Sequence, residues 1–377
     1  MSASKPVVGV GLIGSGFMGQ AHAFAYHAAP VVFDLPCEVV SRRLADHSLE
    51  VAEPAAARFG FRAASGDWRE LLSDPEVQVV AITAPNRLHR EMALAAIAAG
   101  KHVHCEKPLA PTAEESKEMA LAAEAAGLVT QVGFNYLKNP VIALARDLIA
   151  AGELGEIRSF RGVHAEDYMA DAGQPWSWRL DPAGGGGAFA DLGSHVISLA
   201  RFLVGPIEEV AGHTHTLVAE RPGPDGVPRR VEVDDVTHAS VRFANGAAGS
   251  LEANWIAAGQ KMQLAFEIYG SEGALTFTQE RLNELRLYRG SGPAAQRGFT
   301  TILAGPEHEP YGAFCVAPGH QLGFNDLKTI EVRDFLTAVC GGPAAGPDFR
   351  EGWQVQAVVD AVLASAREGR SLPVAQS

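Results

Sequence analysis

The sequence predicts an α/β protein: an N-terminal doubly wound parallel sheet followed by a C-terminal α+β domain with a large open, mainly antiparallel sheet. Short apolar runs alternate with Ala-rich stretches up to about residue 133, as βαβ units do. Longer alternating runs follow, which is typical of half-buried antiparallel strands. Because 377 residues exceed one comfortable core, we expect two domains, 1–133 and 134–377.

The first domain is predicted from short apolar runs and the helix-forming residues between them. The apolar runs predict strands at 7–13, 38–45, 77–83 and 101–105. The intervening segments predict helices at 17–28, 48–59, 90–99 and 113–126. This alternation requires crossover connections, and such connections produce a parallel sheet.

The second domain is predicted from longer runs of alternating polarity at 156–167, 207–218, 236–256 and 262–278. The pair Asn245-Gly246 suits a tight hairpin turn within the third of these runs. Residues 290–325 show few strand signals, so we expect a long loop there. Residues 350–368 have a helical pattern, and we expect this last helix to pack back on the first domain.

Composition and charge exclude several classes of partner. The net charge of -13 repels phosphate backbones and anionic lipid, so we expect no nucleic-acid or membrane partner. The four cysteines lie far apart without a C-x-x-C pair, which favours reduced thiols and a cytoplasmic location. We also expect no metal, because the remaining histidines lack metal-ligand spacing to carboxylates: His213, His215, His238, His308 and His320.

A glycine-rich turn follows the first predicted strand. Two overlapping G-x-G-x-x-G patterns are present, Gly9-Gly11-Gly14 and Gly14-Gly16-Gly19. We favour the second, because the first would place its glycines inside the strand. In a Rossmann fold, this turn lets backbone amides approach a pyrophosphate at a helix N-terminus. The candidate dinucleotide-binding residues here are Gly14, Gly16, Phe17, Met18 and Gly19.

A Rossmann site also needs a carboxylate after the second strand to bind the adenosine ribose. Asp46 is our candidate, with Asp34 and Glu38 as rivals. Asp46 lies farther from the glycines than is usual, which an insertion around residues 28–36 explains. A carboxylate there repels the 2'-phosphate of NADP, so NAD is favoured. Arg42 or Arg43 would make NADP use plausible if either reached the ribose.

The most informative segment is a short strand ending in Glu106-Lys107-Pro108. Over essentially its whole length, the chain resembles the glucose-fructose oxidoreductase, inositol dehydrogenase and rhizopine catabolism family, especially members that oxidise sugar hydroxyls. Two positions depart from the family pattern, Ala84 and Lys138. Further matching motifs are Gly14–Gly19, Pro85-Asn86 with His89, Asn135-Tyr136 with Pro140, Trp178-Arg179, and Gly185–Gly187 followed by Asp191 and His195.

The resemblance implies an NAD-dependent dehydrogenase acting on a sugar, anhydrosugar or cyclitol, with Lys107, Asp191 and His195 as the catalytic set. The chemistry of these residue types agrees with that role. Hydride leaves a carbinol carbon as its hydroxyl proton departs, and the ordinary pKa of histidine suits the base. Asp191 precedes His195 by four residues, so both can share a helix face. Lys107 supplies positive charge where an alkoxide develops.

The resemblance also implies contacts with the bound molecules and a cis peptide before Pro108. Along the cofactor we expect Pro85, Asn86, His89, Glu106, Lys107 and Arg179. The candidate substrate contacts are Lys107, Tyr136, Trp178, Asp191, His195 and Asn325. Of these, Trp178 and Asn325 are chosen only because such side chains can line a sugar pocket.

Other interpretations stay open at this point. Asp191 would be explained as a helix cap, and His195 as a satisfied core histidine. Competing functions are an NADP(H)-dependent sugar reductase, a glycosidase that uses NAD transiently, and a non-catalytic sugar or dinucleotide sensor. An open antiparallel sheet with one uncovered face also predicts a homodimer or homotetramer.

Overall fold

The computed structural model describes residues 5–223 and 225–375, which form two compact units. Unit 1 runs to Lys138 and includes Gly323–Trp353. Unit 2 comprises Asn139–Leu322 and the chain from Gln354 onward. The predicted second domain includes everything after residue 133, whereas the segment 323–353 lies in unit 1. The chain therefore returns to its first unit after building most of the second.

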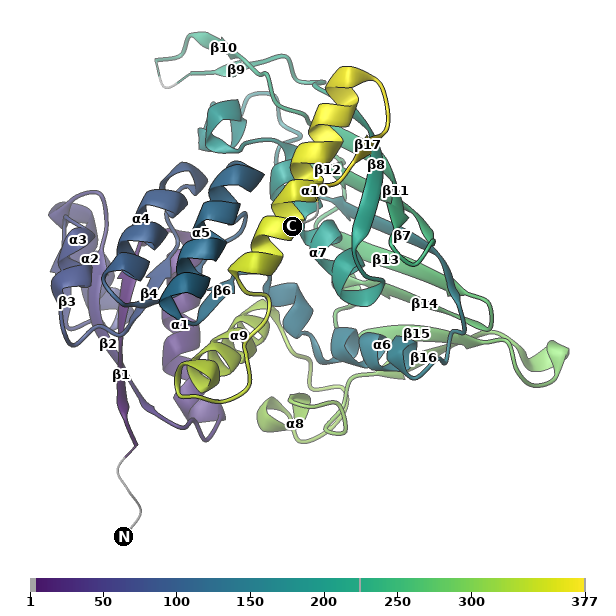
Figure 1. Ribbon diagram of the computed structural model, residues 1–377, viewed down its shortest axis with the longest axis horizontal. Helices are drawn as coiled ribbons and strands as arrows, with labels where there is room; N and C mark the ends of the chain where they lie inside the picture. Colours follow the sequence, from purple (N-terminus) through teal and green to yellow (C-terminus); the bar gives the residue numbers. More distant parts are fainter. Residues whose placement is uncertain (1–4, 224, 376–377) are drawn as a thin grey trace. The chain divides into compact units, whose positions relative to one another are not determined.

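Unit 1 contains a parallel sheet with the strand order β3-β2-β1-β4-β5-β6 (Figure 1). This order reverses between β1 and β4, which is where a doubly wound sheet binds its ligand. The strands are β1 (Val7–Ile13), β2 (Glu38–Ala45), β3 (Ala63–Ser65), β4 (Val79–Ile82), β5 (His102–Cys105) and β6 (Thr130–Val132). The helices between them are α1 (Phe17–Val32), α2 (Leu49–Phe59), α3 (Arg69–Ser73), α4 (Asn86–Ala98) and α5 (Ala113–Ala126).

Helix α9 (Phe324–Val339) completes unit 1 from a distant part of the sequence. Its apolar residues Val332, Phe335 and Leu336 are buried with β1 and with Tyr26 of α1. Residues Phe349–Trp353, the start of α10 (Phe349–Glu368), also belong to unit 1. Burial of this apolar face is what stabilises α9 on the sheet.

Unit 2 contains a nine-stranded sheet with the order β16-β15-β14-β13-β7-β12-β11-β8-β17, parallel only between β7 and β12. Its strands are β7 (Ile157–Ala165), β8 (Ile207–His215), β11 (Val236–Phe243), β12 (Ala248–Asn254), β13 (Gln263–Gly270), β14 (Gly273–Thr278), β15 (Glu284–Arg289), β16 (Phe299–Leu303) and β17 (Leu372–Pro373). A separate two-stranded ribbon joins β9 (Glu220–Pro222) to β10 (Pro228–Arg230). The predicted fold class is confirmed, including its large, mainly antiparallel sheet.

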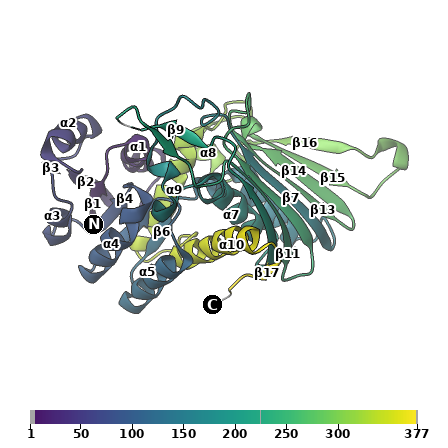
Figure 2. The ribbon, with the colours of Figure 1, turned by 90° about the horizontal axis from the view of Figure 1, so that it is seen from above.

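The large sheet is covered on one face. Strand β11 alternates between buried and exposed residues, as a strand with one solvated face does. Helix α7 (Ser194–Leu203) packs against β7, β12 and β13, and Figure 2 shows the opposite face of the sheet without a covering helix among the described residues. The other α-helices of this unit are α6 (Pro140–Ala150), α8 (Tyr311–Phe314) and the part of α10 that follows Trp353.

Two local predictions have different outcomes. The expectation of a long loop over 290–325 is wrong, because strand β16 and helix α8 both lie in it. The residues of β16 do not alternate in polarity and are mostly exposed, because this strand lies at the edge of the sheet. The Asn245-Gly246 turn does join β11 to β12, and Gly246 has the positive φ of 87° that favours glycine.

Within residues 5–223 and 225–375, none of the helices is long and apolar enough to cross a membrane. All four cysteines are free thiols: Cys37, Cys105, Cys315 and Cys340. The peptide bond between Lys107 and Pro108 is cis, as the family resemblance implies.

Candidate active site

The glycine turn after β1 has the geometry of a dinucleotide-binding loop. Gly14 has a φ of 97°, and a Cβ there would lie 2.8 Å from Thr83 Oγ1. A Cβ on Gly19 would lie 2.2 Å from the Gly14 carbonyl oxygen, so the helix packs directly on the turn. Gly9 lies inside β1, as the favoured register of the glycine pattern predicts.

Gly16 differs from the other two glycines of the pattern because its Cβ would meet nothing within 4 Å. It is the N-cap residue of α1, with no side-chain cap, and the first helical turn has no acidic residue. The helix N-terminus therefore presents backbone N–H groups and a positive dipole end to open space. These features fit the pyrophosphate of a dinucleotide.

Asp46 follows β2, and the glycine turn holds its carboxylate. Its Oδ2 accepts hydrogen bonds from Ser15 N at 2.8 Å and from Ser15 Oγ at 2.6 Å. Its Oδ1 accepts a 2.7 Å bond from His47 N. Burial by itself would raise the pKa of Asp46, but the hydrogen bonds from Ser15 and His47 outweigh it and lower the pKa. The carboxylate is thus ionised beside the dinucleotide loop.

The rival residues for this ribose-binding role lie elsewhere in unit 1. The Asp34 side chain is 95% exposed and pairs with Lys5. Glu38 is exposed at the start of β2, the end opposite to Asp46. Arg42 pairs with Glu76 at 3.1 Å, and Arg43 pairs with Glu70 at 3.2 Å. These ion pairs direct both guanidinium groups to acidic residues of the chain.

The turn after β4 is tied to the turn after β5 by a buried histidine. His89 of α4 is fully buried, with Nε2 at 2.8 Å from the Ala84 carbonyl oxygen and Nδ1 at 3.0 Å from that of Pro108. Burial lowers the pKa of His89. Asn86, which begins α4, is also buried, and Pro85 is its N-cap residue. Both nitrogens of His89 thus face backbone carbonyls, so its ring positions the loops on which a cofactor would lie.

Glu106 is buried directly after β5. Its Oε1 lies 2.8 Å from both His22 Nε2 and Lys328 Nζ, and its Oε2 accepts a 3.3 Å bond from Lys107 N. His22 and Lys328 are not among the predicted site residues. The available signal is a lysine at 328 and a glutamate at 331 on the otherwise apolar face of α9.

Aromatic rings gather beside the glycine turn. Phe324, the first residue of α9, lies 5.7 Å from the Phe17 ring and 6.2 Å from the Tyr136 ring, measured between centroids. Asn325 follows on α9, and its carbonyl accepts a bond from Thr329 Oγ1. The predicted site residues Tyr136 and Asn325 therefore lie in unit 1, together with Lys107 and the glycine turn, whereas Trp178 lies in unit 2.

In unit 2, Asp191 is held by two donors. It lies in a π-helical turn, Phe189–Gly193, immediately before α7. Its Oδ2 accepts a 2.9 Å bond from Tyr168 OH and a 3.2 Å bond from Arg179 Nε. Burial and then the Asp191 carboxylate raise the pKa of Tyr168 well above its usual value, so this hydroxyl keeps its proton. Arg179 also stacks on Trp178, 4.5 Å from the ring centroid.

The helix-cap interpretation of Asp191 does not describe this carboxylate. The N-cap residue of α7 is Gly193, which has no side-chain cap hydrogen bond. Instead, the side chain of Asp191 contacts the hydroxyl and guanidinium groups described above. Two donors to the same oxygen hold this carboxylate in a fixed orientation.

A glycine run allows the turn that carries Asp191 to form. Gly187 has a φ of 115°, and a Cβ there would lie 2.3 Å from Asp234 Oδ1. The other oxygen of Asp234 accepts a 2.9 Å bond from Phe189 N at the start of the π-helical turn. Residues Gly184–Gly187 therefore let the Asp234 carboxylate reach the backbone of this turn.

His195 of α7 is 7% exposed and lies beside a second histidine. The ring of His164 is 5.5 Å from the His195 ring, centroid to centroid, in an edge-on arrangement. Nδ1 of His164 lies 3.1 Å from the Leu192 carbonyl oxygen, and its Nε2 lies 2.8 Å from Glu166 Oε1. His164 thus supports the segment between Asp191 and His195. Sequence reasoning does not identify Glu166, which lies within the predicted run 156–167 and directly follows β7 in the structure.

The comparisons with known proteins cover both units. Residues 8–134 match the family described as oxidoreductase family, NAD-binding Rossmann fold. Residues 142–276 match the family described as GFO/IDH/MocA C-terminal domain. These two matches span the glycine turn, Lys107, Asp191 and His195.

Individual relatives agree with the family matches. The chain is 42% identical to levoglucosan dehydrogenase of Pseudarthrobacter phenanthrenivorans over 97% of this chain and 98% of that protein. A structure of levoglucosan dehydrogenase in complex with NADH and levoglucosan has 43% identity and a TM-score of 0.95, covering 98% of this chain and 100% of that one. The scyllo-inositol 2-dehydrogenase (NAD(+)) of Bacillus subtilis is 27% identical over 86% of this chain and 85% of that protein. The chain therefore belongs to the Gfo/Idh/MocA family of NAD-binding oxidoreductases.

Proposed function

We propose that this protein oxidises a secondary hydroxyl of a sugar, anhydrosugar or cyclitol to a ketone while transferring the hydride to NAD. The observation that carries the proposal is Asp191, held by Tyr168 and Arg179 immediately before the helix that bears His195. The 42% identity to levoglucosan dehydrogenase supports an anhydrosugar as the first substrate to test.

The proposed roles follow from the chemistry of each side chain. His195 accepts the proton of the reacting hydroxyl. Asp191 orients the substrate through its carboxylate and offsets positive charge on the histidine. Lys107 donates hydrogen bonds to the oxygen on which negative charge develops. NAD, when bound, supplies the hydride acceptor.

Cofactor contacts are proposed for the residues around the dinucleotide loop. Gly14, Gly16, Phe17, Met18 and Gly19 bind the pyrophosphate through backbone N–H groups, and Asp46 binds the adenosine ribose. The Ser15–Asp46 hydrogen bonds support NAD over NADP, because an ionised carboxylate there repels a 2'-phosphate. Lys107, Glu106 and Arg179 contact the cofactor further along, as do the loop residues Pro85 and Asn86. His89, which is fully buried against two backbone carbonyls, positions these loops instead of touching the cofactor.

Substrate recognition is proposed for a neutral polyol. Tyr136, Trp178 and Asn325 contribute an aromatic and amide lining, since flat rings stack on sugar faces and amides bind hydroxyls. Lys107, Asp191 and His195 add the charged contacts to the reacting carbon and its oxygen. An uncharged substrate agrees with the net charge of -13, which disfavours anionic sugar phosphates.

The test follows NADH absorbance with purified protein across levoglucosan, inositols, free aldoses and glycosides. The wild-type protein is expected to form NADH and ketone in equal amounts with at least one of them. His195→Ala is expected to lose about 100-fold or more in kcat, because general-base catalysis contributes that much. His320→Gln is the matched control, since His320 is exposed and is not among the proposed catalytic, cofactor or substrate contacts.

Each competing function gives a different result in the same assay. A glycosidase that uses NAD transiently cleaves glycosides without net NADH formation. A reductase consumes NADPH with a keto sugar faster than it consumes NADH. A sensor binds NAD or sugar without turnover. Unchanged activity in His195→Ala would refute the proposed mechanism.

The exposed face of the large sheet supports a homodimer or homotetramer. A groove on the strands β7, β8, β11, β12 and β13 is lined by both charged and apolar side chains, including Arg161, His238, Glu252 and Phe266. Pairing two copies of such a face removes it from solvent. Light scattering is expected to give two or four times the chain mass. Replacing Phe266 with a charged residue is not a suitable test of the interface, because Phe266 is buried in the monomer.

A further inference from the structure

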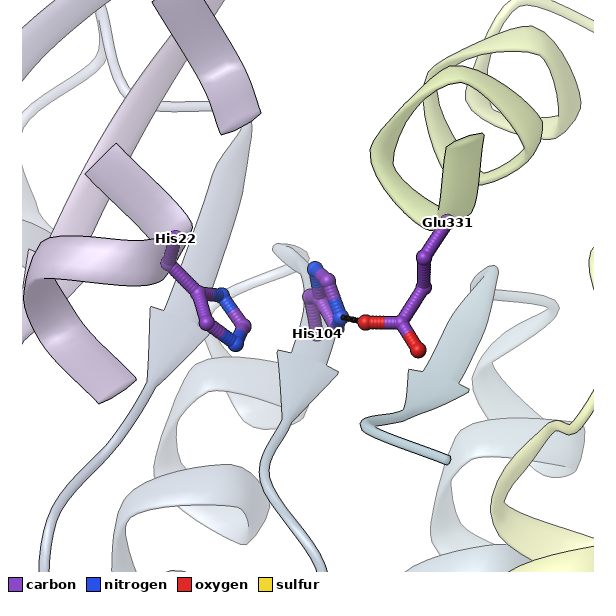
Figure 3. Close-up of side chains that lie close together, drawn as sticks. All are labelled: His22, His104 and Glu331. Carbon is purple, nitrogen blue, oxygen red and sulfur yellow. Dashed lines mark hydrogen bonds and ion pairs between the residues drawn. The ribbon is translucent and has the colours of Figure 1, made fainter. Parts of the chain in front are cut away.

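A buried polar cluster lies in unit 1 next to Glu106. His22 comes from α1, His104 from β5, and Lys328 and Glu331 from α9. The side chains of these four residues have no exposed surface, and that of Glu106 is 6% exposed. Figure 3 shows His22, His104 and Glu331 directed toward one another.

The ammonium group of Lys328 is the centre of this cluster. Its Nζ lies 2.8 Å from Glu106 Oε1 and 2.6 Å from Glu331 Oε1. Burial opposes the charged form of Lys328, but both carboxylates outweigh this effect and raise the pKa of Lys328. Burial likewise opposes ionisation of Glu106, and Lys328 and His22 lower the pKa of Glu106 well below its usual value. The cluster therefore contains a buried ammonium between two buried carboxylates.

A metal ion is the alternative occupant to consider. Ligand atoms of His22, His104 and Glu331 lie within 4.8 Å of one another. However, Lys328 Nζ already lies at hydrogen-bond distance from Glu331. A divalent cation beside this ammonium would meet strong repulsion in a buried site. The geometry thus favours an ion-pair network over a metal centre.

Glu106 connects this network to the turn that carries Lys107. Its Oε2 accepts the backbone N–H of Lys107, the residue before the cis peptide bond. At the end of β6, a Cβ on Gly133 would lie 2.5 Å from Glu106 Oε1, so the carboxylate fits only against a glycine. The carboxylate is therefore enclosed by α1, α9 and the ends of β5 and β6, and its position fixes the start of the turn.

We propose that Lys328 is a positioning residue for the dehydrogenase reaction: its ammonium holds the Glu106 carboxylate in place and thereby orients Lys107. This inference rests on the proposed function, because it assigns Lys107 a role in hydride transfer. Lys328 lies 222 residues after Glu106 in the sequence. Helix α9 therefore supplies the positive charge that pairs with a carboxylate directly after β5. Without the ammonium, Glu106 takes up a proton and loses its fixed position.

The expected proton uptake follows from what surrounds Glu106. The groups that interact with Glu106 are His22 from α1, His89 from α4, Cys105 from β5, Lys328 and Glu331 from α9, and the backbone N–H of Lys107. Burial, His104 and Lys328 lower the pKa of His22 to about 4, so this histidine is neutral at pH 7. When Lys328 is absent, burial acts on both groups and favours a neutral carboxyl beside a neutral imidazole.

The test compares the double variant Lys328→Met/Glu331→Gln with the single variant Glu331→Gln, which differ only at position 328. Lys328→Met alone leaves two buried carboxylates without a counter-ion and is expected to impair folding. The double variant Lys328→Met/Glu331→Gln removes one positive and one negative charge together. Glu331→Gln alone is the matched control, because it keeps the Lys328–Glu106 pair. Both proteins are first compared by thermal unfolding.

The catalytic readout is steady-state turnover with NAD and the best substrate of the wild-type protein. Relative to Glu331→Gln, the double variant is expected to lose roughly ten- to a hundredfold in kcat, because misplaced catalytic groups have effects of this size. The KM values are expected to change less than kcat. The primary deuterium isotope effect on kcat, measured with substrate deuterated at the oxidised carbon, is expected to rise. Equal kcat in the two variants would overturn the inference.

Two further measurements do not depend on turnover. NADH binding, followed by fluorescence, is expected to be similar in the two variants. Infrared spectra at pH 7 are expected to show a protonated carboxyl band in the double variant only, and adding Glu106→Gln should remove it. Absence of that band would show that Glu106 stays ionised without Lys328 and would overturn the inference. If wild-type protein oxidises no polyol, the proposed function fails, while the infrared comparison still decides whether Lys328 holds Glu106.

Discussion

Tyr168 donates a 2.9 Å hydrogen bond from its hydroxyl group to Oδ2 of Asp191, the oxygen that also accepts from Arg179. The two residues are separated by 23 positions in the sequence and meet within unit 2. The bond joins a phenol that keeps its proton to a carboxylate that lies before α7. Loss of this bond should therefore affect the chemistry assigned to Asp191.

Tyr168→Phe is expected to lower kcat/KM by about ten- to a hundredfold, because a hydrogen bond to a charged group contributes roughly 1.5–3 kcal/mol. Steady-state kinetics with the best polyol substrate measure this effect. Tyr269→Phe is the control, since Tyr269 donates a similar 2.7 Å bond to Glu267 on the exposed sheet face. Equal activity of both variants would remove Tyr168 from the site.

Gly16→Ala should separate folding from cofactor binding. The added Cβ meets nothing within 4 Å, and the φ of -68° suits alanine, so the unfolding temperature without cofactor should stay nearly unchanged. NADH affinity should fall about tenfold or more, because the methyl group occupies the space through which a pyrophosphate approaches the helix N-terminus. Fluorescence titration and thermal unfolding test the two parts.

Gly19→Ala provides the contrasting result for that experiment. Its Cβ would lie 2.2 Å from the Gly14 carbonyl oxygen, so this variant is expected to unfold at lower temperature even without cofactor. If Gly16→Ala bound NADH as tightly as the wild type, the dinucleotide would have to lie elsewhere than over this turn.

Asp46→Ala is expected to weaken NADH binding and to reduce the preference for NADH over NADPH. The ionised carboxylate lies beside Ser15, where it would accept ribose hydroxyls and repel a 2'-phosphate. Titrations with NADH and NADPH, followed by fluorescence, give the two dissociation constants. Asp34→Ala, at the exposed rival position, should leave both unchanged. The reverse result would assign the ribose to Asp34.

Stability in mild acid should depend on His22. Its pKa is lowered from 6.5 to about 4 in the folded protein, by burial first and then by neighbouring positive groups. As pH falls through 6.5, the unfolded chain binds a proton at this histidine and the folded chain does not. The free energy of unfolding should therefore drop by about 2 to 3 kcal/mol between pH 6.5 and 4.5 on account of this group.

The variant His22→Gln should lack that part of the pH dependence, because its amide still donates to Glu106 but does not titrate. Denaturant unfolding at several pH values between 6.5 and 4.5 provides the measurement. The window ends at 4.5 because Glu106 begins to lose its own contribution below that pH. His320→Gln, at an exposed position, should retain the full dependence of the wild type. A parallel decrease in wild type and His22→Gln would contradict the assignment.

The elements that sequence patterns identify are those whose signals are local. Strands β1 and β4 are continuous apolar runs, and β2 and β5 are short runs that mix apolar with polar residues. The glycine turn after β1 has its own spacing. Short elements such as β3 and β6 escape prediction, because three residues carry too little periodicity to recognise. Strand β16 escapes for a different reason, since its five residues do not alternate in polarity and it pairs with the sheet on one side only.

Some residues of the candidate site can likewise be recognised from local sequence signals, whereas the contacts of others are seen only in the structure. The glycine turn and Asp46 are recognisable because each follows a predicted strand, and both have the geometry expected of them. His89 is recognisable as a motif residue, but only the structure shows that its ring faces the carbonyls of Ala84 and Pro108. A linear pattern indicates which residue types are present and leaves open which atoms they contact.

The sequence by itself determined the parallel and antiparallel halves, the glycine turn, the Glu106-Lys107-Pro108 segment and the candidate residues Asp191 and His195. Only the tertiary structure decided that α9 returns to unit 1, that Lys328 pairs with Glu106, and that Tyr168 and Arg179 hold Asp191. The physical reason is the distance along the chain over which each kind of interaction acts. Helix and strand periods and turn chemistry act between neighbours in the chain, whereas the burial and pairing of charges depend on which distant segments pack together.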